Sequence, residues 1–543
     1  MLNPSDTVFT CSPGEDREFW RTACAERDAR PARLWNDEEI AALRDFNAQA
    51  GAPDAALGQI ARLADPRTLV VVAGQQAGLF LSPLYVLYKA VAAVKWAVRL
   101  ERLLERPVIG MFWIASEDHD LEEVRHVHYL DRDGGLARWT YGAGDESIDA
   151  LQGRSVFDVP LRGDLLAGFF EEIEQNVHRT DEKTARIEQW RAMAEASESF
   201  EDFFARGMAH VLGRFGLVLV PSGLGPIRRR AVPAIEREIE KPGESTAWVQ
   251  HAIEQSRARG AAPPLHRRGD EVNFFLYRDG LRCKVTLGAA GEFLVHHPVS
   301  GEILERATTD GLQGELASKP ERFSPNVITR SVVQDAALPV IAMLAGGVER
   351  QYLALLRDVY GFFGVPRSRV LVRPRALLIE PSLERYMEKH GVPADLLARE
   401  AWDEVEERIV RSSGHGATLE ALEEVLRNNE ADFRRLGERL GRLAEVPAVA
   451  SAIEKTASAT RKAMQRLEQR VRDEIEREQE AGGNHLQRLR AALHPDGKPQ
   501  ERVLGPCFPF LLNHGENLIS WLVESLDLDD VRVQPLFLSN IRE

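Results

Sequence analysis

Four consecutive residues carry three carboxylates and one imidazole: Glu117, Asp118, His119 and Asp120. They follow, after Ser116, an apolar run at 108–115, whose β-branched and aromatic residues are typical of a buried parallel strand. Because ligands of open α/β sheets bind just beyond the carboxyl ends of the strands, the pattern predicts acid–base chemistry at this point. The alternative is a polar loop in which Asp118 or Asp120 caps a short helix.

A second segment, earlier in the chain, repeats this arrangement. The β-branched run 69–72 leads into a Gly-Gln-Gln-Ala-Gly turn at 74–78, whose glycines permit close approach of the backbone. A helix is expected to begin near Ser82-Pro83 and to run towards Glu105, and its start could bind phosphate. Strand, turn, helix and strand form one βαβ unit, so the two polar turns should emerge side by side.

A third strand end of the same kind follows the apolar run 338–343. Gly346-Gly347 follow it two residues later, and Glu349 stands where the next helix should start. Three strand ends with polar residues favour one shared ligand site over three unrelated loops.

The segment before that third strand also carries polar residues. Ser324-Pro325 indicates a helix start. Arg330 and Gln334 are four residues apart, so they should share a helix face, where Arg330 could hold a carboxylate or a phosphate bidentately. A surface arginine beside a solvated glutamine is the alternative.

Helical stretches separate these strands from two further candidates at 216–220 and 370–373. The alternation predicts an α/β fold with a doubly wound, mostly parallel sheet over roughly residues 60–380.

Two insertions interrupt this sheet. Residues 151–212 are charged and helical in pattern. Residues 265–300 alternate in polarity around Asp279-Gly280, which predicts a β-hairpin with a third strand at 292–296.

Beyond about Leu383 the pattern changes to helical heptads. Apolar residues step by three and four through 417–446 and again through 448–481. Two such helices, joined by a short turn, predict an antiparallel coiled-coil arm of the kind used for dimerisation or partner binding. The alternative is a hairpin whose two helices fully cover each other. The expected domains are a core at 1–382, a helical coiled-coil domain at 383–490, and a segment at 491–543 that returns to the core after Gly482-Gly483.

Composition limits the classes of function. The chain has 543 residues, with 69 lysines and arginines against 84 aspartates and glutamates, a net charge of −15, which argues against a non-specific nucleic-acid binder. Residues 1–6 lack the basic and apolar regions of a signal peptide, and no apolar run approaches the roughly 18 residues of a membrane span. Cys11, Cys24, Cys283 and Cys507 form no Cys-x-x-Cys pair, which favours reduced thiols in the cytoplasm.

Histidine spacing gives little support for a bound metal. His126 and His128 are two apart and His296-His297 are adjacent, and none shows the spacing of a helical zinc site. No protein metal site is expected, and a Mg²⁺ held mainly by nucleotide phosphates is more plausible than zinc.

With these residues identified, the chain resembles the bacillithiol-biosynthesis cysteine-adding enzymes, also called cysteine ligases. The matching segments span nearly the whole chain: 73–80, 85–89, 112–124, 323–327 and 496–502. Two departures stand out. The segment 345–349 lacks the proline usual in the family's Gly-Gly-Pro-Gly-Glu turn, and Ala73 replaces a common threonine.

The resemblance implies a Rossmann-like core related to nucleotidyltransferases, with inserted connecting segments, and a coiled-coil domain that pairs two subunits as a homodimer. The implied task is to add cysteine to glucosaminyl-malate. The nucleotidyltransferase analogy is imperfect, because no His-x-Gly-His occurs and the Gln-Gln turn takes its place.

Joining a carboxylate to an amine is uphill in water, so the acid must be activated, and ATP with Mg²⁺ is a candidate activator without a P-loop to support it. Such a site needs phosphate-binding turns, cations and a base for the amine. The expected catalytic residues are Glu117, Asp118, His119 and Asp120. The expected substrate- or nucleotide-binding residues are Gly74, Gln75, Gln76, Gly78, Lys89, Ser324, Asn326, Arg330, Gln334, Gly346, Gly347, Glu349 and Arg502.

Two other classes of function stay open. One is a metal-dependent hydrolase or nucleotidyltransferase that uses residues 117–120 as ligands. The other is a non-catalytic scaffold built around the coiled-coil arm.

Overall fold

The computed structural model describes residues 16–412, 416–443, 447–481 and 485–542. Its centre is a five-stranded sheet of order β12-β11-β1-β2-β5, in which every neighbouring pair is parallel. The strands are β1 (Leu69–Gln75), β2 (Val108–Ile114), β5 (Val218–Pro221), β11 (Val340–Ala345) and β12 (Arg369–Val372). The five predicted strands and the doubly wound α/β class are confirmed.

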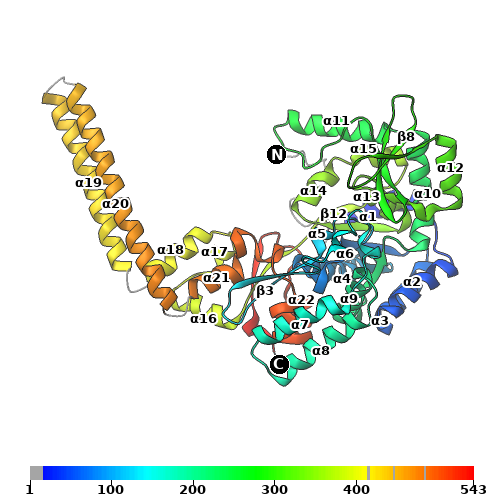
Figure 1. Cartoon of the computed structure of the whole chain (residues 1–543), viewed down its shortest axis with the longest axis horizontal. Helices are drawn as coiled ribbons and strands as arrows, with labels where there is room; N and C mark the ends of the chain where they lie inside the picture. The colour runs from blue at the N-terminus through cyan, green and yellow to red at the C-terminus, as the bar shows by residue number, and fades with distance from the viewer. Residues whose placement is uncertain (1–15, 413–415, 444–446, 482–484, 543) are drawn as a thin grey trace.

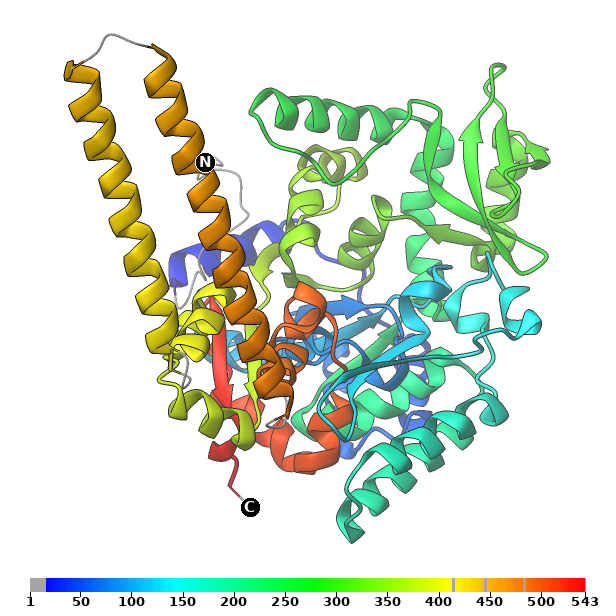
Figure 2. The same cartoon turned by 60° about the vertical axis from the view of Figure 1, so that its left-hand side comes forward.

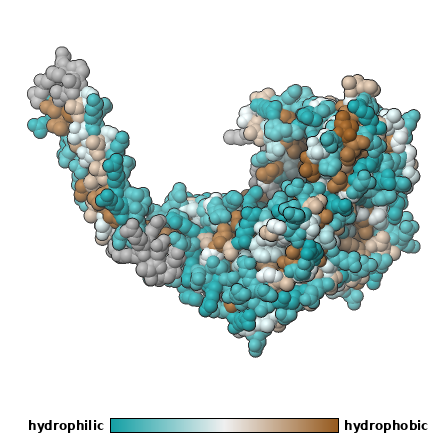
Figure 3. Space-filling model, in the orientation of Figure 1, coloured by the Kyte–Doolittle hydropathy of each residue, from teal (hydrophilic) through white to brown (hydrophobic). Residues whose placement is uncertain are grey.

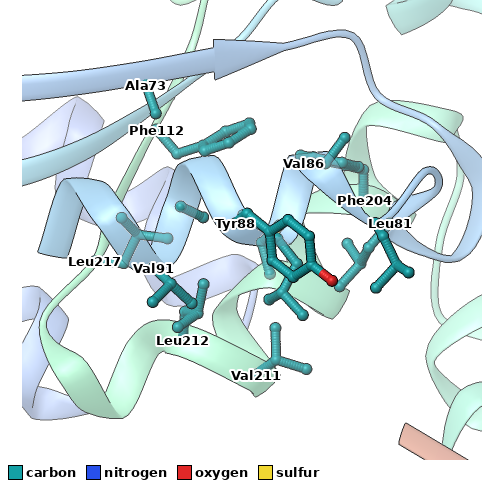
Figure 4. Packing of buried hydrophobic residues seen from close by; sticks show 14 of the residues in the cluster. Ala73, Leu81, Val86, Tyr88, Val91, Phe112, Phe204, Val211, Leu212 and Leu217 are labelled. Carbon is teal, nitrogen blue, oxygen red and sulfur yellow. The ribbon is translucent and has the colours of Figure 1, made fainter. Parts of the chain in front are cut away.

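Successive side chains of these strands enter two different cores. Val71, Phe112 and Leu219 belong to one apolar cluster, whereas Val70 and Met111 belong to the other. Because side chains alternate between the faces of a strand, helices must cover both faces of the sheet. Figure 4 shows one layer, where Tyr88 and Val91 of α4 (Tyr85–Leu104) pack with Phe112 of β2 and with Val211 and Leu212 of α9 (Phe200–Leu212).

Strand order locates the crevice of the sheet. The chain moves outward from β1 to β2 and β5, then returns to the other side of β1 for β11 and β12. The order therefore reverses between β1 and β11, and ligands of such sheets bind at the carboxyl ends of the strands near this reversal. Helices α13 (Thr329–Ala337), α14 (Gly347–Ala354) and α15 (Arg357–Phe363) belong to the β11–β12 half.

One predicted helix start is confirmed within two residues, and the other is wrong. Helix α4 begins at Tyr85, close to the predicted Ser82-Pro83, but Ser82 does not cap it, because its N-cap is Leu84, which offers no side-chain hydrogen bond. Ser324-Pro325 lies in β10 (Phe323–Pro325), where Ser324 pairs with Phe275. Serine followed by proline is a local signal, and packing against another strand overrides it in the second case.

The predicted hairpin forms the centre of a second sheet, of order β10-β6-β7-β8-β9. Strands β6 (Glu271–Arg278) and β7 (Leu281–Leu287) turn at Asp279 and Gly280, both of which have positive φ (51° and 77°). The third predicted strand is β8 (Phe293–His296), and β9 (Ile303–Ala307) was not predicted. This sheet packs its own apolar cluster against α10 (Gly225–Glu240) and α12 (Thr309–Ser318).

The insertion at 151–212 is helical, as predicted, with α7 (Gly163–Asn176), α8 (Asp181–Glu195) and α9. A small hairpin of β3 (His126–Leu130) and β4 (Leu136–Thr140) precedes it and was not predicted. Helices α1 (Arg17–Asp28), α2 (Asp37–Gln49), α3 (Asp54–Ala61) and α11 (Glu244–Ala258) complete the body.

A long two-helix arm projects from the body (Figures 1 and 2). It consists of α19 (Gly416–Leu443) and α20 (Pro447–Ala481), which lie side by side and antiparallel in both views. The predicted turn at 445–447 and Gly482-Gly483 fall largely or wholly outside the described residues. The coiled-coil arm is confirmed.

Helices on both sides of the arm in the sequence pack together at its base, and the chain after the arm returns to the body. Helices α16 (Pro381–Lys389), α17 (Ala394–Ala398), α18 (Trp402–Ser412) and α21 (His485–Leu493) share one apolar cluster. Helix α22 (Leu512–Ser525) joins the α4 core, and β14 (Val533–Phe537) pairs in parallel with β13 (Arg375–Ile379).

Two further observations concern the chain as a whole. No helix among the described residues is long and apolar enough to cross a membrane. Cys24, Cys283 and Cys507 are buried free thiols, while Cys11 lies outside the described residues.

Candidate active site

The turns after β1 and β2 lie at the same edge of the sheet. The strands are parallel, and Gln75 pairs in register with Ile114. The amide nitrogen of Gln76 donates to Oδ2 of Asp118 over 2.9 Å, which joins the two turns directly. The predicted meeting of these two turns is therefore observed.

Lys89 connects the β1 turn to the third strand end. This buried side chain of α4 donates to the Gly74 carbonyl over 2.9 Å and to Gln75 Oε1 over 3.2 Å. It also lies 2.8 Å from Oε2 of Glu349, the third residue of α14, which follows β11. One ammonium group thus links two of the three strand ends, those of β1 and β11.

Arg330 of α13 stands beside this ion pair. Its Nη2 donates to the Tyr352 hydroxyl over 2.6 Å and lies 3.7 Å from Glu349 Oε1. Burial would raise the pKa of Glu349, but Lys89 and Arg330 outweigh burial and lower it, so Glu349 is a carboxylate at neutral pH. Gln334 is buried rather than solvated, and its amide nitrogen has no hydrogen-bond partner among the described residues.

The four residues 117–120 separate into different environments. Glu117 is buried, and its Oε1 lies 2.8 Å from Nη2 of Arg228, which also donates to the Phe323 carbonyl. Asp120 caps α5 (Leu121–Val124) by accepting the Glu123 N–H over 3.2 Å, so the capping alternative is correct for Asp120.

Asp118 and His119 are the partly exposed members of this group, with side-chain exposures of 42% and 35%. Asp118 accepts Gln76 through Oδ2 and the His119 backbone N–H through Oδ1, over 2.8 Å for the latter. The carboxylate is thereby held in one orientation while part of it stays accessible to a substrate.

Arg282 of β7 reaches this site and was missed by the sequence interpretation. Its Nε donates to Ser324 Oγ over 3.0 Å, its Nη2 to the Pro325 carbonyl over 2.8 Å, and its Nη1 to His119 Nδ1 over 3.2 Å. An arginine on an inserted hairpin carries no local signal that marks it as part of a site 163 residues away.

The pKa of His119 reflects these surroundings. Burial lowers the pKa of the imidazole, and the charge of Arg282 lowers it further, against the opposing charges of Asp118 and Asp120. His119 is therefore neutral at pH 7.

A further part of the site comes from α4 and the C-terminal segment. Arg373 lies 5.2 Å above the ring of Tyr85 and forms a buried pair with Glu501, at 2.7 Å between Nη2 and Oε1. Burial and the charge of Glu123 raise the pKa of Tyr85 to about 12, while Arg373 and the exposed Arg502 act in the opposite direction. This part of the site brings a cation, Arg502, close to the Tyr85 hydroxyl.

Other predicted binding residues hold the backbone. A Cβ on Gly78 would lie 2.3 Å from the Ser82 carbonyl, and a Cβ on Gly74 would lie 3.1 Å from the Trp113 carbonyl. Asn326 accepts the Ile328 N–H over 2.9 Å and donates to Asn273 over 3.0 Å.

The two remaining glycines, Gly346 and Gly347, start α14, where Gly346 N–H donates to Glu349 Oε2 over 3.4 Å.

The start of α4 is not an open phosphate site. Its N-cap residue, Leu84, donates its backbone N–H to the Leu504 carbonyl over 2.8 Å, and residues 79–82 in front of it are buried. Cationic side chains would have to supply phosphate contacts here instead.

The described part of the chain contains no group of three or more His, Cys, Asp or Glu side chains placed to hold a metal ion. His126 Nδ1 lies 2.9 Å from Thr140 Oγ1, and His296 Nε2 lies 2.8 Å from Thr286 Oγ1, so both take part in hairpin contacts.

Comparisons with known proteins give a consistent result. Residues 6–374 match the family model described as bacillithiol biosynthesis BshC, N-terminal Rossmann-like domain, and residues 376–537 match the BshC C-terminal coiled-coil domain. A relative from Heliobacterium modesticaldum is 30% identical over 502 residues, 89% of this chain and 86% of that protein. One from Desulforamulus reducens is 27% identical over 97% of this chain and 94% of its own length, and one from Geobacillus thermodenitrificans is 30% identical over 85% and 83%. All three are named "Putative cysteine ligase BshC".

Proposed function

The chain belongs to the BshC family of bacillithiol biosynthesis, and on this premise we propose that it is a ligase that joins cysteine to glucosaminyl-malate through an amide bond. The observation that carries the proposal is the meeting of three polar strand ends at the reversal of strand order, through the Gln76–Asp118 and Lys89–Glu349 contacts. The names of the relatives support a ligase, and the amide bond is our proposal.

The chemistry requires an activated acid. The amine of glucosaminyl-malate attacks the carboxyl carbon of activated cysteine, a C–N bond forms, the bond to the leaving group breaks, and the amine loses a proton. Asp118 is the carboxylate that we assign to accept this proton, since it is partly exposed and held by Gln76.

We assign activation to ATP, with Mg²⁺ bound chiefly by the phosphates because the described residues provide no metal-ligand cluster of their own. The side chains suited to an anionic group are Arg330 and the exposed Arg502. Lys89 is already paired with Glu349, so its main contribution is to hold the turns in place.

The arm supports a homodimer within this proposal. Val425, Leu436 and Leu467 are 47%, 44% and 44% exposed on α19 and α20, more apolar surface than a two-helix seam needs. A second copy of the chain would cover it. We place the ligase in the cytoplasm, in keeping with its buried free thiols, with small-molecule substrates and neither nucleic acid nor membrane as a partner.

The test is an assay of the purified chain with cysteine and glucosaminyl-malate, with and without ATP and Mg²⁺, read by mass spectrometry. We expect the amide product in wild type, its loss in Asp118→Asn, and its retention in Glu122→Gln, a matched control at an exposed site nearby. Product formation in Asp118→Asn equal to wild type would refute the assigned base.

Stoichiometric Mn²⁺ or Zn²⁺ with hydrolysis or nucleotidyl transfer would favour the metal enzyme instead. Retention of cellular function in Asp118→Asn, with loss on arm mutation, would favour the scaffold.

A further inference from the structure

His119 can act in either of two opposite ways, according to which ring nitrogen carries its proton. If Nδ1 donates to a carboxylate, Nε2 has a free lone pair and can serve as a base. If Nδ1 accepts a hydrogen bond, the neutral ring carries its proton on Nε2 and can only donate there. The contacts of Nδ1 decide between these states.

A carboxylate partner for Nδ1 is present but poorly placed. Asp118 Oδ1 lies 3.6 Å from Nδ1, beyond ordinary hydrogen-bond length. That oxygen already accepts the His119 backbone N–H over 2.8 Å, and the other oxygen of Asp118 accepts Gln76. Both oxygens of Asp118 thus already accept other donors and neither holds Nδ1, although each keeps a lone pair for a substrate.

A cationic partner is closer and directed at the ring. Nη1 of Arg282 lies 3.2 Å from Nδ1 with its N–H aimed at the ring nitrogen. A guanidinium has five donors and no acceptor, so Nδ1 must supply the lone pair.

Arg282 has little freedom to turn away. Nε and Nη2 are bound to Ser324 and Pro325, its side chain is 7% exposed, and its guanidinium carbon lies 3.9 Å from the centre of the Phe275 ring. Phe275 also contacts the His119 ring, edge to face at 5.8 Å between centroids.

We propose that His119 is a neutral hydrogen-bond donor through Nε2–H, and that Arg282 is the positioning residue that fixes this tautomer. The inference rests on the proposed ligase function for its substrate: the acceptor is the oxygen of the activated carboxyl group, where negative charge develops as the amine attacks. Nε2 forms no hydrogen bond with any residue in the described ranges, so it is available for this oxygen.

The charged groups around the ring agree with this role. Arg282 faces it from β7, and Asp118 and Asp120 face it from its own loop. Burial and Arg282 together keep the ring neutral, because a second proton on Nδ1 would point at a cation. His119 resembles a base in sequence, but the proton of the amine goes to Asp118.

The direct test is the ring tautomer of the substrate-free full chain, read by ¹⁵N NMR of labelled histidine at pH 8 and assigned with His119→Gln. We expect Nε2 protonated and Nδ1 bare, and a protonated Nδ1 overturns the proposal. Arg282→Met should raise the pKa of His119 and populate the Nδ1–H form, whereas Arg282→Lys should keep the wild-type tautomer. Arg138→Met is the matched control, since Arg138 lies 2.6 Å from Nε2 of a different histidine, His126.

Activity provides the second readout. Glutamine at position 119 can donate an N–H but cannot act as a base, and leucine can do neither. Loss of one such donor costs roughly 10²–10³ in rate in known enzymes. We therefore expect His119→Leu to lose about a hundredfold or more and His119→Gln to lose about tenfold or less. Equal losses in both variants overturn the donor role. Because the tautomer is measured without substrate, its outcome stands apart from any failure to form the amide.

Discussion

Glu501→Gln should lower the free energy of unfolding of the core by about 3–5 kcal/mol, the usual cost of removing one member of a buried ion pair. Arg373 donates to both oxygens of Glu501, over 2.7 and 2.9 Å, and Arg375 donates to one of them over 3.3 Å. Glutamine keeps the shape but turns one acceptor into a donor that faces a buried cation. The size of the effect follows from burial, because Glu501 is 3% exposed and Arg373 is 5% exposed.

A matched surface pair sets the scale. Glu516 lies 2.5 Å from Arg214, but the two side chains are 54% and 39% exposed, so Glu516→Gln should cost less than about 1 kcal/mol. Replacing both core partners, as Arg373→Met with Glu501→Leu, should recover much of the loss, since no unpaired charge then stays buried at position 373.

The effect should also depend on pH. Burial alone would raise the pKa of Glu501, but Arg373 and Arg375 outweigh it and hold the pKa below its ordinary 4.5. A lowered folded-state pKa contributes stability that is present above about pH 4.5 and is lost as pH falls through the folded value. Denaturant unfolding at pH 7 and pH 3.5 measures this, and the difference between wild type and Glu501→Gln should narrow at the lower pH by up to about 1.4 kcal/mol. A difference below about 1 kcal/mol at pH 7 would refute the reasoning.

Four further predictions test other parts of the molecule. Asp118→Asn should abolish amide formation while unfolding changes by about 0.5 kcal/mol or less, and a melting point lower by ten degrees or more would mark Asp118 as structural. Glu238 is buried and its pKa is raised to about 7, so stability should fall by about 3 kcal/mol as pH rises from about 4.5 to 7. Glu238→Gln should flatten that slope in denaturant titrations, and an unchanged slope would contradict it. The Tyr88 hydroxyl is buried in the apolar layer of Figure 4 without a hydrogen-bond partner among the described residues, so Tyr88→Phe should raise the free energy of unfolding by about 1 kcal/mol, and a clear loss would reveal a missed partner. Light scattering should find a dimer for the full chain and a monomer after deletion of 417–481, whereas a dimer that persists would place the interface on the body.

Local patterns were sufficient for most of the sheet. Runs such as Leu69–Val72 and Val108–Ile114 are apolar on both faces and can only be stable between two layers of helices, so the sequence alone predicts them. The meeting of the first two turns followed from the βαβ unit, whose two strands are parallel neighbours and end at the same edge of the sheet. The helix start at Ser324-Pro325 failed because Ser324 pairs with Phe275 on another strand, which lies far along the chain.

Local sequence patterns also predicted the site residues that lie at strand ends, but not those that come from the inserted sheet. Gln76 and Asp118 follow the ends of β1 and β2 and contact each other there, and Lys89 of α4, the helix between these strands, contacts the same β1 turn. Arg282 comes from an inserted hairpin, and only the folded chain brings it to His119. Exposed apolar residues gather on that inserted sheet in Figure 3, where Val299 and Leu304 are 59% and 47% exposed. The alternation of polar and apolar residues did not predict strand β9 of the same sheet.

The C-terminal segment covers the start of α4, and this matters while the chain is being translated. Leu84 donates to the Leu504 carbonyl, and α22 packs into the same apolar core as α4. About 400 residues separate the end of α4 from this cover, so at about 5–20 residues per second a ribosome takes roughly 20–80 s to supply it. During that interval one apolar side of the nascent core has no native cover. The long arm is translated within the same interval, so the surface of the proposed dimer is present before the core is closed.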